Sequence, residues 1–261
     1  MAYIKLKIWA GDVYECIQTF CVNYGNHKGR KKKVGKSTIK QILLNEKNSK
    51  RKLTRLINAN FTMGDLFITL SYLGEEPTIE QARKDLVNFL RRVKYYRKRN
   101  RLSDVKYIAT TEYMEQRTNH HIIMSAMSWD IIQELWMTGK VYITRLYDKD
   151  YVGIANYITK ERKKAFSRRW TQSRNLQKPK VEAEPIKNGQ AEVRAPKGYK
   201  VVEKSLNTTD MGYFHQYVKA IRMGGRDYGE GETGAEKSGA LDTGGLPKAH
   251  RKGSGKKQVP K

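Results

Sequence analysis

The sequence has few cysteines, few acidic residues and no long apolar run. Among its 261 residues only Cys16 and Cys21 are cysteines. One pair is too few for a disulfide framework or a zinc site, so we expect reduced thiols and a cytoplasmic protein. No apolar stretch approaches the roughly 18 to 20 residues that a membrane-spanning helix needs. The amino terminus shows no signal-peptide core. We therefore expect no membrane partner.

The shortage of acidic residues leaves a large excess of positive charge. Lysine and arginine total 52 against 26 acidic residues, which gives a formal charge of +26. Such an excess favours a polyanionic partner, and nucleic acid is the obvious one. Basic residues crowd a loop at 26–36, the helix expected after it, and the segment 162–180. The residues that we expect to contact DNA there are Lys31, Lys32, Lys33, Lys50, Arg51, Arg168, Arg169 and Trp170. Trp170 can either stack on an unpaired base or pack against the core.

Hydrophobic periodicity predicts an α+β protein. The core elements are expected at 65–72 (strand), 79–99 (helix, capped by Thr78), 106–113 and 119–124 (strands), 129–137 (helix), 141–146 (strand) and 149–164 (helix). The order βαββαβ followed by a helix is a ferredoxin-like arrangement, which RRM domains share. Its antiparallel sheet would carry helices on one face and leave the other face free for a site.

The remaining segments are expected to extend this core. Residues 1–60 predict a basic amino-terminal hairpin and a helix that begins after Ser37, with Ile39, Ile42, Leu43, Leu53, Leu56 and Ile57 as its apolar stripe. The endonuclease-like core is expected at 61–180. A carboxyl-terminal extension at 181–223 would contain a strand at 199–202 and a helix around 213–221. Residues 224–261, rich in Gly, Lys, Ser, Glu and Thr, are expected to be disordered.

A cluster of polar side chains falls on the two central strands. Side chains alternate across a strand, so Asn119 and His121 share one face and His120 lies on the other. The hairpin between the strands brings Glu112 close to the histidine pair. One imidazole, one amide oxygen and one carboxylate outline a mixed N/O site that suits Mg²⁺ or Mn²⁺.

A tyrosine and a lysine are expected to join this cluster from the last helix. Tyr157 and Lys160 are three residues apart, so they lie on one helix face. A phenol with a nearby ammonium group, brought to a divalent metal, can attack a phosphodiester.

Three motifs in this order resemble a known family. The segments Phe67-Ile-Thr-Leu-Ser-Tyr72, Asn119-His-His-Ile-Ile123 and Tyr157-Ile-Thr-Lys160 are similar to the motifs of HUH endonucleases that initiate rolling-circle replication. The likeness is closest to the single-tyrosine Rep proteins of small plasmids and phages of Gram-positive bacteria. The family has histidine where this chain has Asn119. The ligand set therefore stays open between Asn119 and His120, beside Glu112 and His121.

The resemblance implies a reaction and its partners. Tyr157 would attack single-stranded DNA at a replication origin and form a 5′-phosphotyrosyl bond, and the freed 3′-hydroxyl would prime synthesis. Lys160 would lower the phenol pKa or offset charge in the transition state. Thr69 and Tyr72, in the first motif, would position the DNA. Because the chain has no Walker motif, a host helicase would act beside the host polymerase in a bacterial cytoplasm.

Two other classes of protein remain open from the sequence. The first is a non-catalytic, basic nucleic-acid-binding protein on a ferredoxin-like scaffold, although RRM domains carry aromatic residues where these central strands carry His, Asn and Glu. The second is a relaxase or transposase with the same chemistry.

Overall fold

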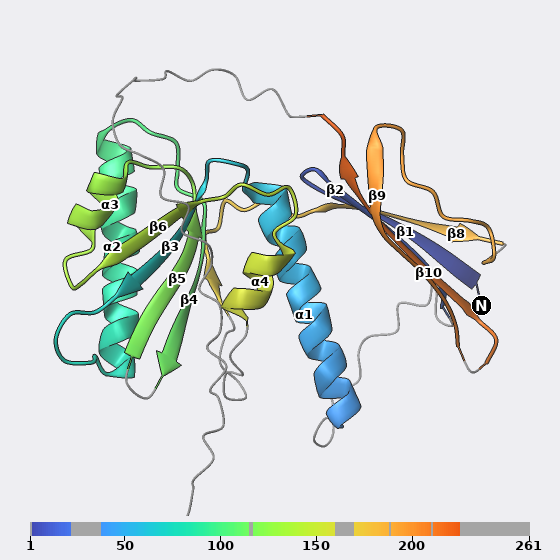
Figure 1. Cartoon of the computed structure of the whole chain (residues 1–261), viewed down its shortest axis with the longest axis horizontal. Helices are drawn as coiled ribbons and strands as arrows, with labels where there is room; N and C mark the ends of the chain where they lie inside the picture. The colour runs from blue at the N-terminus through green and yellow to red at the C-terminus, as the bar shows by residue number, and fades with distance from the viewer. Residues whose placement is uncertain are drawn as a thin grey trace, which may run out of the picture. The chain divides into compact units, whose positions relative to one another are not determined.

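The computed structural model describes residues 2–21, 38–114, 117–159, 170–187, 189–209 and 211–224. Within these ranges the chain forms two antiparallel sheets of five strands each and four helices (Figure 1). This confirms the expected α+β class. We call the sheet of β3 to β7 the core sheet and the sheet of β1, β2 and β8 to β10 the second sheet.

The core sheet has the strand order β6-β3-β5-β4-β7. Its strands are β3 (Leu66–Ser71), β4 (Tyr107–Met114), β5 (Arg117–Met124), β6 (Val141–Arg145) and β7 (Thr171–Gln172). Strand β5 lies between β3 and β4, antiparallel to both. This is the split βαβ order of a ferredoxin-like fold, as predicted.

Helices cover both faces of the core sheet (Figure 1). On one face α2 (Ile79–Arg99) and α3 (Trp129–Leu135) pack over a cluster that includes Leu70, Phe89 and Trp136. On the other face α1 (Ile39–Asn60) and α4 (Val152–Ile158) pack against Ile108 and Ile123. The second face is therefore only partly free, contrary to our expectation, because apolar residues of α1 and α4 need the same apolar end of the sheet.

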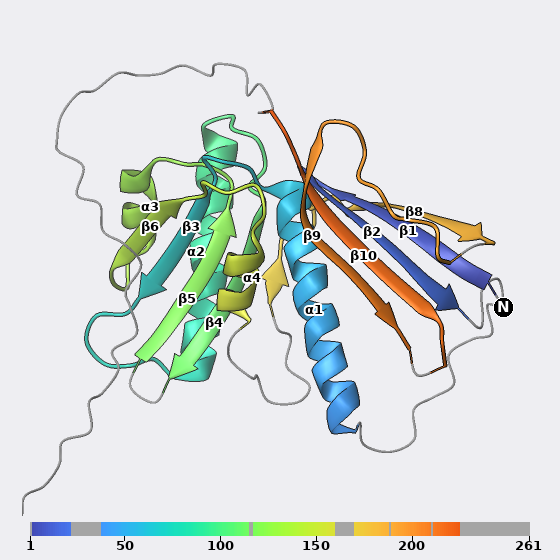
Figure 2. The same ribbon diagram turned by 45° about the vertical axis from the view of Figure 1, so that its right-hand side comes forward.

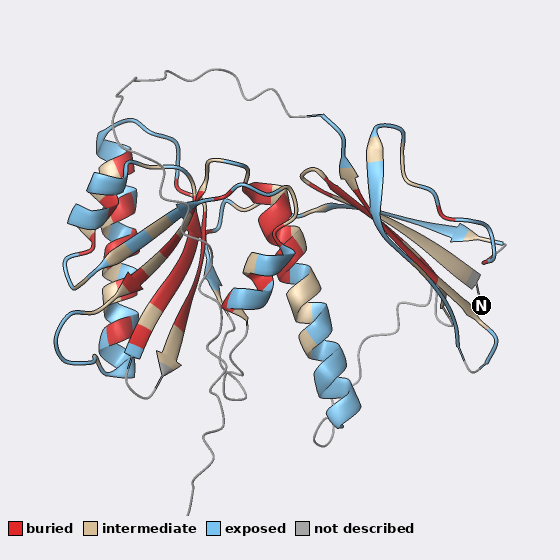
Figure 3. Cartoon of the chain, in the orientation of Figure 1, coloured by how far each residue is buried: buried red, intermediate tan, exposed pale blue. Residues whose placement is uncertain are grey.

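Helix α1 differs from its prediction in two ways. The side chain of Thr38, rather than Ser37, caps the helix by accepting a hydrogen bond from the backbone N of Gln41 at 3.3 Å. The expected apolar stripe is buried only from Leu53 onward, and the earlier turns, with Ile39 and Leu43, are exposed (Figure 3). Periodicity alone could not show where the sheet beneath the helix ends.

The second sheet joins the two ends of the described chain. Its order is β8-β1-β2-β10-β9, from β1 (Ala2–Ala10), β2 (Val13–Cys21), β8 (Lys180–Ile186), β9 (Tyr199–Thr208) and β10 (Phe214–Arg222) (Figure 2). The amino-terminal hairpin is confirmed, and its turn uses Gly11 at φ 62°. The helix expected around 213–221 is wrong. This segment is β10, which pairs with both β2 and β9.

Two ion pairs link the second sheet to the helices on the core sheet. The guanidinium of Arg55 in α1 donates two hydrogen bonds to Glu15 in β2, at 3.0 and 2.7 Å. The ammonium group of Lys219 in β10 pairs with Asp150, just before α4. Three of these four side chains are at least four-fifths buried, and Arg55 is 20 % exposed. Such pairs are costly to break because one charge would be left buried.

Several predicted features lie outside the described residues. They are the basic loop with Lys31, Lys32 and Lys33, the residues Lys160, Arg168 and Arg169, and nearly all of the tail expected at 224–261. In the described part of the chain, no helix is long and apolar enough to cross a membrane.

The uneven burial of α1 gives a direct test of its packing. Leu53 is fully buried and Leu43 is 51 % exposed on the same helix. We expect Leu53→Ala to lower the free energy of unfolding by about 2 to 5 kcal/mol, because a cavity replaces packed atoms. Leu43→Ala should change it by less than about 0.5 kcal/mol. Urea unfolding measures both, and equal losses would contradict this packing.

Candidate active site

The candidate site lies on the face of the core sheet that α1 and α4 partly cover. The register places Glu112 opposite Asn119, and His121 between Thr69 and Thr110. Residues that are directly opposite in an antiparallel pair share a face. These side chains therefore project to the same side, next to the apolar cluster around Ile123.

His121 is held by a hydrogen bond at each ring nitrogen. Its Nδ1 lies 3.1 Å from Oγ1 of Thr69, and its Nε2 lies 2.8 Å from Oε2 of Glu112. The ring also stacks on Phe67, with centroids 6.0 Å apart and planes at 8°. The imidazole is thus fixed in position, with Nε2 directed at the carboxylate.

Tyr157 reaches this cluster from α4. Its ring makes edge contacts with His121 at 5.0 Å and with Phe67 at 5.9 Å between centroids. The side chain is 52 % exposed, so a ligand from solvent can reach the phenol. Burial, and then the negative charge of Glu112, raise the pKa of the Tyr157 phenol. The structure therefore brings Glu112, Asn119, His121 and Tyr157 together on one face.

The donor set for a metal ion is incomplete without Asn119. No group of three His, Cys, Asp or Glu side chains that could hold a metal occurs among the described residues. Glu112 and His121 supply two such donors, and the amide of Asn119, opposite Glu112, would be the third. The side chain of Glu112 is 24 % exposed. One imidazole nitrogen beside two oxygens in a partly open site fits Mg²⁺ or Mn²⁺ better than a softer ion.

His120 belongs to the other face of β5. It is fully buried, and its ring nitrogens lie 2.9 Å from the hydroxyls of Tyr72 and Thr111. It also makes an edge contact with Trp136. The structure thus separates His120 from the Glu112 cluster, and hydrogen bonding in the core accounts for both of its nitrogens.

Two residues of the first motif make contacts other than the expected ones. Tyr72 lies under α2, where its hydroxyl donates to Asp85 at 3.3 Å and bonds to His120. Burial and the charge of Asp85 raise the pKa of the Tyr72 phenol. Thr69 orients His121. DNA positioning by these two residues stays a prediction, and their visible contacts are within the protein.

The described DNA-contact candidates lie away from the cluster. Lys50 and Arg51 are partly buried on α1, and both line a pocket on the side of the second sheet. Trp170 packs against the apolar cluster beneath α1 and α4, and its Nε1 donates to Gln172 at 2.9 Å. Of the two interpretations left open for Trp170, packing is the one with contacts in the structure.

One functional residue was missed from the sequence. Phe67 contacts both His121 and Tyr157 and fixes the angle between their rings. The alternation of residues 67, 69 and 71 along the strand already placed its side chain on the same face as Thr69. That signal was available, but an apolar residue next to a polar site resembles an ordinary core residue.

Fold and site together define a class. The chain carries an antiparallel ferredoxin-like sheet with a His-Glu pair and a solvent-accessible tyrosine on one face. Residues 65–164 match the model of a family described as Replication-associated protein ORF2. The match runs from β3 to beyond α4 and contains all three motifs, whereas the second sheet lies outside it. The resemblance to replication initiators is therefore confirmed over this segment, and it supports a role in starting DNA replication. No curated protein and no solved structure matches the chain.

The contacts of Tyr72 predict a structural role that can be measured. Tyr72→Phe leaves Asp85 and the Nε2 of His120 without the bonds that the hydroxyl makes. We expect a loss of about 1 to 3 kcal/mol in the free energy of unfolding. Tyr142→Phe, at a tyrosine that is 61 % exposed on β6, should cost less than about 0.5 kcal/mol. Denaturant unfolding of the two variants checks this, and a Tyr72→Phe protein as stable as the parent would refute the role.

Proposed function

We propose that the chain is a replication initiator that nicks single-stranded DNA at an origin, with Tyr157 as the nucleophile. The single observation that carries the proposal is the edge contact between Tyr157 and His121, whose Nε2 is bound to Glu112. A nucleophile thus lies beside a group of metal-binding character. The matching family, described as replication-associated, supports the same role.

The residues present fit a divalent cation. Thr69 at Nδ1 fixes the ring of His121, so its Nε2 points at the same space as the Glu112 carboxylate. When Nδ1 carries the proton and donates to Thr69, Nε2 presents a lone pair. Glu112, Asn119 and His121 would hold the ion. It would supply positive charge to the non-bridging oxygens of the scissile phosphate.

The pKa of Tyr157 supports this donor set. The phenol must lose its proton to attack, and the negative charge of Glu112 opposes that loss. A cation held by Glu112 would reverse the sign of this local field. Lys160, three residues along the chain, would act in the same direction.

The reaction is a transesterification that conserves the phosphodiester bond energy. The phenolate oxygen of Tyr157 bonds to phosphorus while the bond from phosphorus to the 3′ oxygen breaks. The 3′ oxygen leaves with a proton as a free hydroxyl, and the 5′ phosphate stays on the protein. Phe67 holds the phenol ring by its edge and thereby limits the directions from which Tyr157 can attack. The 3′-hydroxyl then primes the host polymerase behind a host helicase.

A covalent adduct is the test of this function. Purified protein is incubated with single-stranded oligonucleotides that cover its own upstream and coding region, with Mn²⁺ or with EDTA. We expect a denaturation-resistant protein-DNA adduct with Mn²⁺ only, and its complete loss in Tyr157→Phe.

The matched control is Tyr142→Phe. Tyr142 pairs with Thr69 across β3 and β6 and is exposed on the same face, so it is the other accessible phenol near the site. This variant should keep forming the adduct. An adduct that depends on Tyr142 would move the nucleophile to β6, and binding without any adduct would favour the non-catalytic DNA-binding protein.

Metal binding can be tested without catalysis. We expect Thr69→Val to weaken Mn²⁺ binding by about 10- to 100-fold, as loss of a partner behind a ligand does. Glu112→Gln and His121→Ala should weaken it further. Glu76→Gln is the control, because that carboxylate accepts a bond from the backbone N of Thr118 and lies outside the donor set. Calorimetric titration gives the affinities, and equal affinity in all four variants would argue against this metal site.

A further inference from the structure

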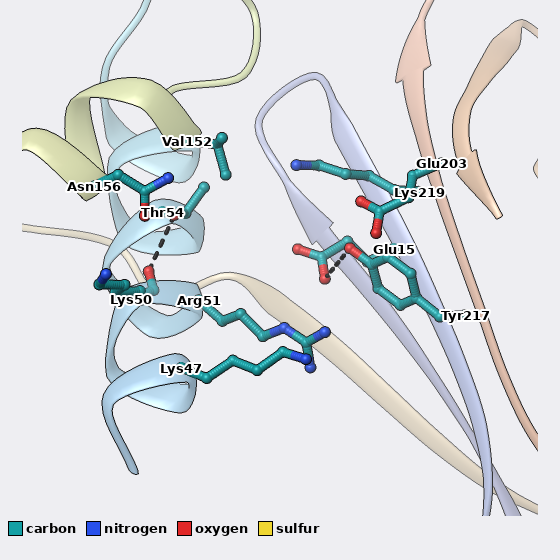
Figure 4. A pocket seen from close by; sticks show the side chains of 10 residues that line it. All are labelled: Glu15, Lys47, Lys50, Arg51, Thr54, Val152, Asn156, Glu203, Tyr217 and Lys219. Atoms are coloured by element: carbon teal, nitrogen blue, oxygen red, sulfur yellow. Dashed lines mark hydrogen bonds between the residues drawn. The ribbon is translucent and has the colours of Figure 1, made fainter. Parts of the chain in front are cut away.

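A pocket of about 200 Å³ lies between α1, α4 and the second sheet, apart from the cluster at Tyr157 (Figure 4). Helix α1 contributes Lys47, Lys50 and Arg51 to its wall. The side chains of Lys47 and Arg51 extend from α1 toward the strands, and Lys219 extends from β10 toward α1 (Figure 4). Nothing in the mechanism uses this pocket.

The pocket has more cationic than anionic groups free to act on a ligand. Lys219 pairs with Asp150, and Glu15 is neutralised by Arg55 while it accepts a hydrogen bond from Tyr217 at 3.2 Å. In the part of the chain that the structure describes, Lys47, Lys50 and Arg51 have no salt bridge to a carboxylate. Three cations therefore face one remaining lining carboxylate, that of Glu203.

The positive field reaches the strands across the pocket. The guanidinium of Arg51 lies 5.4 Å from the centroid of the Tyr217 ring, which holds it over β10. Burial, and then the charges of Arg51 and Lys47, lower the pKa of His215 on the same strand. An anion between α1 and β10 would relieve this repulsion among like charges.

The position of the pocket indicates its ligand. Its third wall is α4, which contributes Val152 and Asn156. Asn156 is the residue directly before Tyr157, so one short helix borders the pocket and carries the proposed nucleophile. A DNA strand held at Tyr157 reaches the pocket within a few nucleotides.

We propose that this pocket binds a backbone phosphate of the DNA strand beside the nick, so that α1 and the second sheet form a second DNA-binding site. The inference rests on the proposed function for the identity of the strand. It assigns Lys47, Lys50 and Arg51 to one phosphate site with Tyr217 and Lys219 as its opposite wall. The second sheet, which lies outside the family match, thereby gains a role in holding DNA.

The test measures binding in full-length Tyr157→Phe protein, where no covalent step interferes. The pocket variant adds Lys47→Gln, Lys50→Gln and Arg51→Gln. The control variant adds Arg83→Gln, Lys84→Gln and Arg91→Gln, three exposed cations of α2 on the opposite face of the core sheet. Both variants lose the same charge, so a difference between them reports position.

The first readout is the dependence of binding on salt. For a single strand, each lost phosphate contact lowers the slope of log affinity against log salt by about 0.7. We expect the slope of the pocket variant to fall by up to about 2 and that of the control to stay close to the parent. Equal slopes for the two variants would overturn the proposal.

The second readout locates the phosphate. One neutral methylphosphonate linkage is moved along the oligonucleotide, and a linkage beside the nick should weaken binding to the parent by several-fold. That loss should vanish in the pocket variant, since a double-mutant cycle removes one interaction only once. A loss that persists unchanged would overturn the pocket as its partner, as would pocket-dependent binding of a mononucleotide with no such coupling. Failure of the proposed function would appear separately, as a lack of adduct in the unmodified protein.

Discussion

The register of β5 between β3 and β4 is the constraint on which the site depends. It puts Thr69, His121 and Glu112 on one face and Leu70, His120 and Thr111 on the other. A slip by one residue would exchange the two histidines, because side chains alternate with period two. The two faces bury different chemistry, so the slip would also carry Ile122 and Met124 out of the core under α2. Packing of the apolar face thereby fixes the position of the polar one.

The same pair of histidines shows how environment assigns roles to identical side chains. His120 has two hydroxyl partners and an indole edge in a closed core, so its hydrogen-bonding capacity is used within the protein. His121 has one hydroxyl and one carboxylate at an open edge beside Tyr157. A carboxylate that meets solvent can exchange its histidine partner for a cation, whereas a buried hydroxyl cannot supply the charge that a cation needs.

Buried ion pairs give the second sheet its relation to the core sheet. Arg55 with Glu15, and Lys219 with Asp150, join strands near the two ends of the described chain to α1 and to the segment before α4. Helices α1 and α4 are thus held from both sides, by the apolar cluster under Ile123 and by these charges. The pairing leaves Lys47, Lys50 and Arg51 without carboxylate partners among the described residues, on the helix face toward the second sheet. Charge compensation at one level of α1 therefore creates the uncompensated cationic wall one turn away.

The sequence by itself determined the elements of the core and the face of each strand. Apolar alternation over 66–71 and 119–124 and the Thr78 cap of α2 are local signals, and local backbone geometry converts them directly into strands, a helix start and a side-chain direction. The grouping of Glu112, Asn119 and His121 followed from the same alternation. Only the tertiary structure decided the rest. Segment 213–221 became a strand because β2 and β9 lie beside it, and the first turns of α1 stayed exposed because no sheet lies beneath them. The pocket needs α1, α4 and β10 at once. Each of these outcomes depends on contacts between residues far apart in the chain, and no local pattern encodes which partner will supply them.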